Sequence, residues 1–142
     1  IEKNIEEFLK LKGNYNKTVV GDGPELQKYI NKYPEINFVG VKTGEELAKY
    51  YANADVFVFP SKTDTLGNVI LEALASGTPI AAHPVTGPID VLTDEKINTL
   101  DNDLLQSIKK ALKVKRVDCR NFTLNLTWDK CVKEFLEYMV KV

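Results

Sequence analysis

The stretch DVFVFPSKTDTLGNVILEALASGTPIAA, residues 55–82, has two short apolar segments on either side of a helical pattern. Residues 56–59 are β-branched or aromatic, and residues 79–82 form the second apolar segment. Both are typical of buried strands, and a strand–helix–strand unit of this length implies two parallel strands. The polar loop 61–67 then lies at the carboxyl end of a strand, which is where ligands bind in open α/β sheets.

The helix predicted from Asn68 onward is apolar around most of its circumference. At about 100° per residue its polar residues form one narrow stripe, made of Asn68, Glu72 and Ser76. Because burying an unpaired carboxylate is costly, Glu72 needs a basic partner, backbone donors or a ligand with hydroxyl groups. The free N–H groups at the helix start favour an anion such as phosphate. Taken singly, the residues of this region fit a helix cap, a turn or a paired core carboxylate equally well.

The residues FPSKTDTLGNVILEALASGTPIAA, 59–82, resemble the signature of the donor-binding half of retaining glycosyltransferases of the GT-B fold, family four. In that signature an acid is followed, after seven residues, by a glutamate. Asp64 stands at the first acidic position and Leu66 stands where phenylalanine is usual. The sequence is similar in particular to phosphatidylinositol mannosyltransferases and glycolipid synthases. The resemblance extends from Glu2 to about Trp128.

The resemblance implies transfer of a hexose from a nucleotide diphosphate sugar to a lipid or saccharide acceptor, with retention and without a metal or cofactor. Asp64 is implied to bind sugar hydroxyls and Glu72 the ribose, and these two acids are the catalytic candidates. A donor linked to GDP or UDP is implied to contact Lys3, Gly21, Gly23, Val41, Lys42, Thr65, Leu66, Gly67, Asn68, Val69 and Glu72.

Two further loops support a site at the same edge of the sheet. Residues 18–20 lead into a glycine turn at Gly21, and residues 36–39 lead into a second loop at Gly40. Each suits a ligand-facing loop, but the first does not match the GxGxxG dinucleotide fingerprint. Lys3 matches a lysine that contacts the donor diphosphate in the resembled family, although its position alone fits a solvated lysine equally well.

Composition limits the remaining choices. A chain of 142 residues with 44% hydrophobic residues is most simply one domain, and a net charge of −1 argues against a general nucleic-acid binder. Cys119 and Cys131 have no metal-ligand spacing, so we expect reduced thiols and a cytoplasmic protein. No apolar run reaches the roughly 20 residues of a membrane span. Peripheral contact of the full-length protein with the inner face of the membrane stays open.

We expect an α/β fold, a Rossmann-like doubly wound parallel sheet flanked by helices, which is one half of a GT-B enzyme. Residues 1–142 are then the donor-binding domain, without the amino-terminal acceptor domain. A first strand is also missing from this topology, between the strands 18–20 and 56–59. We therefore expect a preceding strand outside the sequence or a compensating rearrangement.

The carboxyl-terminal third is predicted to be scaffold. The pattern indicates a short last strand at 97–100 and amphipathic helices at 104–112, 117–124 and 127–140. The last helix is predicted to be capped by Thr127 and to face inward with four apolar residues, namely Trp128, Val132, Phe135 and Leu136.

One alternative is a non-catalytic nucleotide-binding or regulatory module with the same sheet. A response-regulator type of switch needs clustered acids at the first strand end, and no such pair occurs here. A scaffold of the resembled family that has lost activity stays open, because of Asp64 and Leu66. The single histidine, His83, has no serine or cysteine nucleophile with a matched acid, so we predict no general-base role for it.

Overall fold

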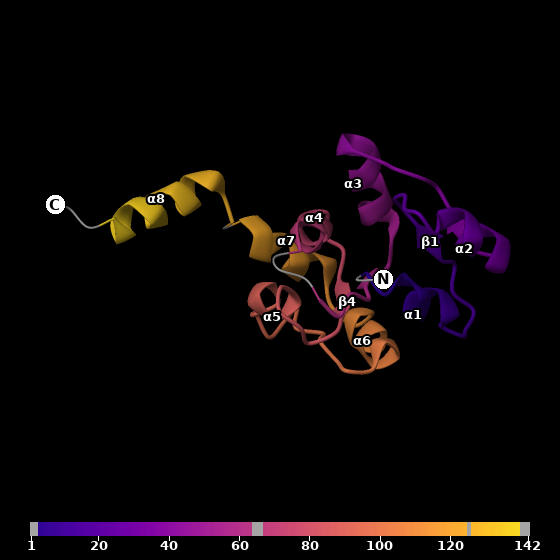
Figure 1. Ribbon diagram of the computed structural model, residues 1–142. Coiled ribbons are helices and arrows are strands. Elements are labelled where there is room, and N and C mark those ends of the chain that lie inside the picture. Colours follow the sequence, from indigo (N-terminus) through magenta and orange to yellow (C-terminus); the bar gives the residue numbers. More distant parts are fainter. Residues whose placement is uncertain (1–2, 64–66, 125, 140–142) are drawn as a thin grey trace.

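The computed structural model describes residues 3–63, 67–124 and 126–139. Helices and strands alternate through the first two thirds of the chain, and helices alone follow (Figure 1). The elements in chain order are α1 (Ile5–Lys10), β1 (Thr18–Val19), α2 (Leu26–Lys32), β2 (Asn37–Phe38), α3 (Gly44–Asn53), β3 (Phe57–Phe59), α4 (Asn68–Ala75), β4 (Ile80–Ala82), α5 (Pro88–Val91), α6 (Leu104–Ala111), α7 (Arg116–Leu124) and α8 (Trp128–Tyr138).

The described strands form two parallel pairs. In the first pair Thr18 of β1 lies opposite Asn37 of β2, and in the second Phe57 of β3 lies opposite Ile80 of β4. Helices α2 and α4 are the crossover connections, as parallel strands require. The predicted α/β class with parallel strands flanked by helices is therefore confirmed, and the predicted β/α/β unit at residues 55–82 has its strands and helix in place.

The two pairs are not hydrogen-bonded to each other within the described residues. The Val19 carbonyl is directed to the β2 side, where it accepts from the N–H of Val39, the residue after β2, at 3.1 Å. Alternate residues of a strand direct their peptide groups to opposite sides, so Thr18 and Val20 direct theirs to the unpaired edge of β1. In β3, Val58 is the residue that directs its peptide groups to the edge away from β4. A direct pairing of β1 with β3, which would contradict the predicted topology, is not found in this part of the chain.

The β3–β4 pair has helices on both of its faces. On one face Phe59, Ile80 and Ala82 contact Ile70 and Leu74 of α4. On the other face Ala81 contacts Leu104, Ile108 and Ala111 of α6. A third cluster, built on Leu9, Tyr29 and Ile36, joins α1 and α2 to the β1–β2 pair. Each strand pair therefore has its own apolar core.

The expected strand at residues 97–100 is wrong, because the structure has no strand there. Thr99 is buried, and its hydroxyl donates to the Ile80 carbonyl. The Ala82 N–H donates to the Ser107 hydroxyl at 2.9 Å, and Ser107 Oγ lies 2.8 Å from the Thr99 carbonyl oxygen. The two hydroxyls, with the Asp101 N–H that donates to the Ala82 carbonyl at 3.3 Å, bond to the outer edge of β4, and this segment follows the edge without forming a ladder.

The predicted inward packing of α8 is also wrong. Thr127 caps the helix as expected, because its side chain accepts from the Lys130 N–H at 3.3 Å. However, α8 extends away from the rest of the molecule (Figure 1), and Trp128 is 85% exposed and Phe135 65% exposed. The periodicity of the sequence identifies an apolar face but not the surface that covers it.

Candidate functional site

The predicted site residues that begin α4 lie at a constrained turn. Gly67 has φ 59° and stands directly before the first helical residue, Asn68. A Cβ atom at this glycine would lie 3.0 Å from Ile70 Cδ1, so that both the left-handed backbone and the space favour glycine. Asn68 is exposed and Val69 is half-buried. The first N–H groups of α4 are therefore presented beside a residue without a side chain, which suits a close approach by an anion.

Glu72 lies one turn further along α4 and is exposed, whereas Ile70, Ala73 and Leu74 are fully buried. The Tyr51 hydroxyl donates to Glu72 Oε2 at 3.3 Å. The polar stripe predicted from the sequence is therefore confirmed, and it faces solvent. The alternative that Glu72 is a carboxylate paired within the core is wrong, because Glu72 is exposed.

The loops after β1 and β2 lie next to each other. The Gly21 N–H donates to the Gly40 carbonyl at 2.8 Å, and Gly21 has φ 130°. Gly23 is exposed, and its N–H donates to Asp22 Oδ1 at 2.7 Å. Helix α2 starts at Leu26, shortly after this glycine turn. The carboxyl ends of β1 and β2 thus present glycine backbone at one edge, as predicted.

Val41 and Lys42 follow β2. Val41 is 64% exposed, which is high for an apolar side chain. Lys42 Nζ lies 2.7 Å from Glu46 Oε1, and this hydrogen bond raises the pKa of Lys42. Lys42 therefore keeps its positive charge beside the loop after β2. In the described structure its ammonium group contacts Glu46 of α3.

Lys3 lies at the end of β3, because its Nζ is 5.7 Å from the centroid of the Phe59 ring. The next residue, Asn4, has a left-handed backbone with φ 46°, and its side-chain amide donates to the Pro60 carbonyl at 3.1 Å. The start of α1 is thus held against the carboxyl end of β3. Lys3 and the loop after β3 therefore share one edge of the molecule.

A polar cluster at this edge was missed by the sequence analysis. His83 Nε2 lies 3.1 Å from Glu7 Oε1, and Lys62 Nζ lies 3.4 Å from Glu7 Oε2. Burial raises the pKa of Glu7, but the hydrogen bond from Asn4 and the contacts with His83 and Lys62 outweigh it and leave that pKa below its usual range. These residues come from α1 and the loops after β3 and β4, and no sequence signal joins such distant positions.

Three predicted site residues, Asp64, Thr65 and Leu66, lie outside the described residues. The residues on either side are described: Thr63 follows β3, and Gly67 directly precedes α4. The implied roles of the three residues in the loop stay predictions.

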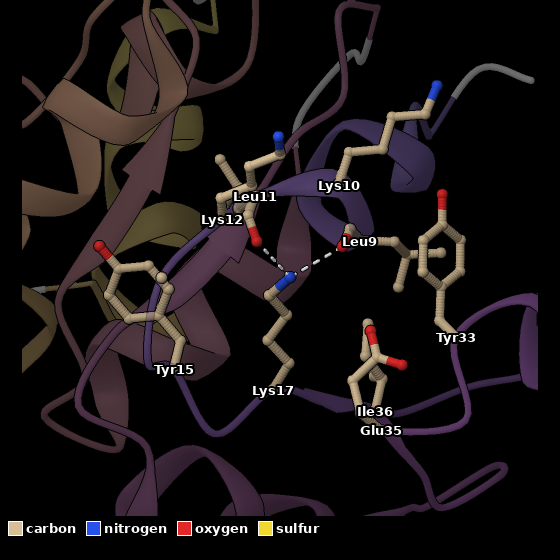
Figure 2. A pocket seen from close by; sticks show the side chains of 10 residues that line it. Leu9, Lys10, Leu11, Lys12, Tyr15, Lys17, Tyr33, Glu35 and Ile36 are labelled. Carbon is tan, nitrogen blue, oxygen red and sulfur yellow. Dashed lines mark hydrogen bonds between the residues drawn. The ribbon is translucent and has the colours of Figure 1, made fainter.

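A pocket of about 440 Å³ lies elsewhere in the molecule (Figure 2). It is formed by the end of α1, the segment before β1 and the segment before β2. Lys17 donates there to the carbonyls of Leu9 at 2.7 Å and Leu11 at 2.6 Å, and burial lowers the pKa of Lys17. The pocket is at the amino end of β1, whereas the predicted site residues lie at the carboxyl ends of the strands. We therefore assign the pocket no part in the candidate site.

Within the described residues no group of three or more histidine, cysteine or acidic side chains is arranged to hold a metal ion. The same residues include no helix that is long and apolar enough to cross a membrane.

Solved structures place the fold in a class. The chain is similar to Anabaena HepE in complex with UDP-glucose, with a TM-score of 0.70 and 18% identity over 97% of this chain and 46% of that one. It is also similar to sucrose-phosphate synthase from Thermosynechococcus elongatus, with a TM-score of 0.73 and 24% identity over 96% of this chain and 41% of that one. The fold is that of one half of a GT-B glycosyltransferase.

Residues 3–114 match the family model described as glycosyl transferases group 1, and the chain belongs to that family. It is 39% identical over 106 residues to a GDP-mannose-dependent alpha-mannosyltransferase of Corynebacterium glutamicum, covering 73% of this chain and 25% of that protein. It is 41% identical over 80 residues to sulfoquinovosyl transferase of Arabidopsis thaliana, covering 54% of this chain and 16% of that protein. The chain thus spans a quarter or less of the length of these two relatives. Membership of this family does not favour the alternative of a non-catalytic module.

Proposed function

We propose that this chain is the donor-binding half of a retaining glycosyltransferase, which transfers a hexose from a nucleotide diphosphate sugar to an acceptor. The observation that carries the proposal is the exposed Glu72 carboxylate, one turn after Asn68, the first residue of α4, which follows the left-handed Gly67. A carboxylate accepts hydrogen bonds from two neighbouring hydroxyls, and the helix start attracts phosphate. A nucleoside diphosphate carries both groups, a ribose with two neighbouring hydroxyls and a diphosphate.

The proposed roles follow from this placement. Glu72 accepts hydrogen bonds from the ribose hydroxyls, while the N–H groups at Asn68 and Val69 and the Lys3 ammonium bind the diphosphate. The glycine backbone at Gly21 and Gly23 allows close approach of the phosphates. Val41 and Lys42 contact the base, and Asp64 with Thr65 and Leu66 binds the sugar.

The chemistry needs stabilisation of a leaving group. The bond between the anomeric carbon and the diphosphate oxygen breaks, and its electron pair leaves with the diphosphate. The oxygen of the acceptor hydroxyl bonds to the carbon, and the proton of that hydroxyl passes to the departing diphosphate. Lysine and helix N–H groups stabilise the charge that develops on the diphosphate. We propose that this charge stabilisation replaces a metal ion or cofactor in the reaction.

The acceptor site belongs to the rest of the full-length protein in this proposal. The chain spans 46% of HepE and 41% of the sucrose-phosphate synthase, so each of these proteins has additional chain outside the similar region. We propose a cytoplasmic enzyme whose other domain binds a lipid or saccharide acceptor and makes any peripheral membrane contact. We propose no nucleic-acid partner, given the net charge of −1.

Amide-shift titrations of the isotope-labelled chain with UDP and with GDP test donor binding. We expect weak binding with shifts at the loops around Gly21 and Gly67 and at Glu72. Shifts confined to the pocket around Lys17 would contradict the proposal.

The substitution Glu72→Gln in the full-length protein tests the ribose role. It keeps the volume of the side chain but replaces a charged acceptor by an amide, so donor affinity should fall about tenfold. Because Glu72 is exposed, the melting temperature should hardly change. An unchanged dissociation constant with a strongly lowered melting temperature would refute the role.

A further inference from the structure

Tyr51 lies in the last turn of α3, which packs beside α4 (Figure 1). Its side chain is 8% exposed, and its hydroxyl reaches Glu72 Oε2 at 3.3 Å. Within the described part of the chain, this is the hydrogen bond that reaches the Glu72 carboxylate. An exposed carboxylate is thus in contact with a donor that is itself buried.

The position of Tyr51 is fixed at its backbone. The Thr78 hydroxyl donates to the Tyr51 carbonyl at 2.5 Å, and Thr78 is fully buried. The Arg116 guanidinium donates to the carbonyls of Ala52 at 2.6 Å and Ala54 at 2.7 Å. These bonds satisfy carbonyl groups at the end of α3, where the helix itself offers no partner. The backbone on both sides of Tyr51 is therefore tied to other elements.

The Tyr51 ring is fixed as well. It packs edge-on against Phe57 of β3, with the ring centroids 5.2 Å apart and the planes at 87°. Such an aromatic pair has a preferred geometry, so the ring and its hydroxyl keep one direction. Burial raises the pKa of Tyr51, and the charge of Glu72 raises it further, so the hydroxyl keeps its proton and donates at neutral pH.

We propose that Tyr51 is a positioning residue, which holds the Glu72 carboxylate in the orientation that binds the donor ribose. This inference rests on the ribose role proposed for Glu72. A free glutamate side chain on a helix surface loses rotamer freedom when it binds a ligand, and this loss costs affinity. The Tyr51 hydrogen bond restrains the carboxylate before the donor arrives. Because an oxygen of a carboxylate has two lone pairs, the bonded Oε2 can still accept from a hydroxyl.

The experiment measures the affinity of the full-length protein for UDP and GDP and for their 2′-deoxy counterparts, by calorimetry. The variant Tyr51→Phe removes the hydroxyl and keeps the ring against Phe57. We expect its dissociation constant for the ribonucleotides to rise about three- to tenfold, with a much smaller change for the 2′-deoxynucleotides. A role in packing alone does not distinguish the two sugars.

Tyr29→Phe is the matched control. The Tyr29 hydroxyl also donates to a glutamate, Glu25 Oε2 at 3.0 Å, and Tyr29 is 9% exposed. The control removes the same type of hydrogen bond on α2. We expect it to change the melting temperature about as much as Tyr51→Phe does, but to leave the preference for ribose over 2′-deoxyribose unaltered.

Glu72→Gln and the double variant separate the inference from the function on which it rests. If Tyr51 acts through Glu72, the double variant binds no more weakly than Glu72→Gln alone. If Glu72→Gln binds ribonucleotides more weakly and Tyr51→Phe binds them as tightly as the parent, the positioning role is overturned and the ribose role is kept. No change in either variant would overturn both. Equal weakening for ribose and deoxyribose in Tyr51→Phe would assign Tyr51 to packing and overturn the inference.

Discussion

The β3–β4 pair is buried on both faces, whereas the β1–β2 pair is covered on one. Ile80, Ala81 and Ala82 are at most 1% exposed, but Thr18 and Asn37 are exposed. The sequences differ in the same way, since β4 is apolar at every position and β2 combines a polar with an apolar residue. A strand covered on both faces needs a continuous apolar run, and a strand covered on one face needs alternation. The composition of each strand thus indicates how many of its faces are covered.

Two matched leucine substitutions give the largest expected difference between the pairs. Leu74→Ala leaves a cavity beside the β3–β4 pair, where Leu74 is fully buried among other buried side chains. We expect a loss of about 3–5 kcal/mol in the free energy of unfolding. Leu9→Ala, in the β1–β2 cluster, should cost about 2–3 kcal/mol, since many of its neighbours are only partly buried and can move into the space. Denaturant unfolding measures both, and an equal or larger loss at Leu9 would contradict the comparison.

Hydrogen exchange tests whether the two pairs are halves of one sheet. We propose that a strand of the full-length protein lies between β1 and β3, because both have an edge without a partner strand in the described chain. The amides of Thr18, Val20 and Val58 should then exchange on the order of 100-fold more slowly in the full-length protein than in this chain alone. The amide of Val39, which already bonds to β1, is the internal control. Equal exchange of the three amides in both proteins would exclude the additional strand.

Glycine substitutions compare the two strand pairs at the carboxyl ends of their strands, where the candidate site lies. Gly67 and Gly40 both have positive φ, of 59° and 70°, but a Cβ atom meets Ile70 at Gly67 and nothing within 4 Å at Gly40. Gly40→Ala should therefore cost about 1 kcal/mol from backbone strain alone, and Gly67→Ala about 2 kcal/mol from strain and crowding together. Thermal unfolding compares the two variants. A larger loss of stability in Gly40→Ala than in Gly67→Ala would show that the new side chain at residue 67 and Ile70 avoid each other without a cost in free energy.

The smallest expected effect concerns the acid dependence of the contact between α1 and the β3–β4 half. The pKa of Glu7 lies below its ordinary value of about 4.5 in the folded chain, so the ionised form stabilises the fold. This stabilisation is fully present above the unfolded pKa and is lost as the pH falls through the folded pKa. Glu7→Gln should thus be less stable than the parent at pH 7, and the difference should shrink below about pH 4.5. Urea unfolding at several pH values measures it, and a difference that is constant with pH would exclude the ion pairs as its cause.

The sequence predicted what depends on short-range pattern. The strands at 57–59 and 80–82 and the start of α4 at Asn68 follow from local apolar runs and turn residues. The first two strands, β1 and β2, are shorter than the expected segments 18–20 and 36–39, because the apolar pattern does not tell how far two strands stay paired. The burial of α8 failed for the same reason, since its apolar face has no covering surface in the described chain.

The parts of the site that the sequence did not predict depend on contacts between distant residues. Glu72 was identified from its place on the helix stripe, but no local pattern joins it to its partner Tyr51, which comes from the preceding helix. The Glu7–His83 pair gave no signal, because each residue is ordinary in its own segment and the two meet only after the sheet has formed. The roles of Asp64 and Leu66 are implied by the resemblance, and they stay predictions.

The exposure of α8 has an optical consequence. Trp128 is the single tryptophan of this chain and is 85% exposed, so its indole emission is that of a fully hydrated fluorophore and is open to quenching by iodide. The helix also presents Cys131 to solvent, whereas Cys119 is buried and burial raises the pKa of its thiol to about 11. Maleimide dyes therefore react first at Cys131, one turn from the indole. The chain thus has an intrinsic fluorophore and a selective labelling position on the same helix, and both report when another surface covers α8.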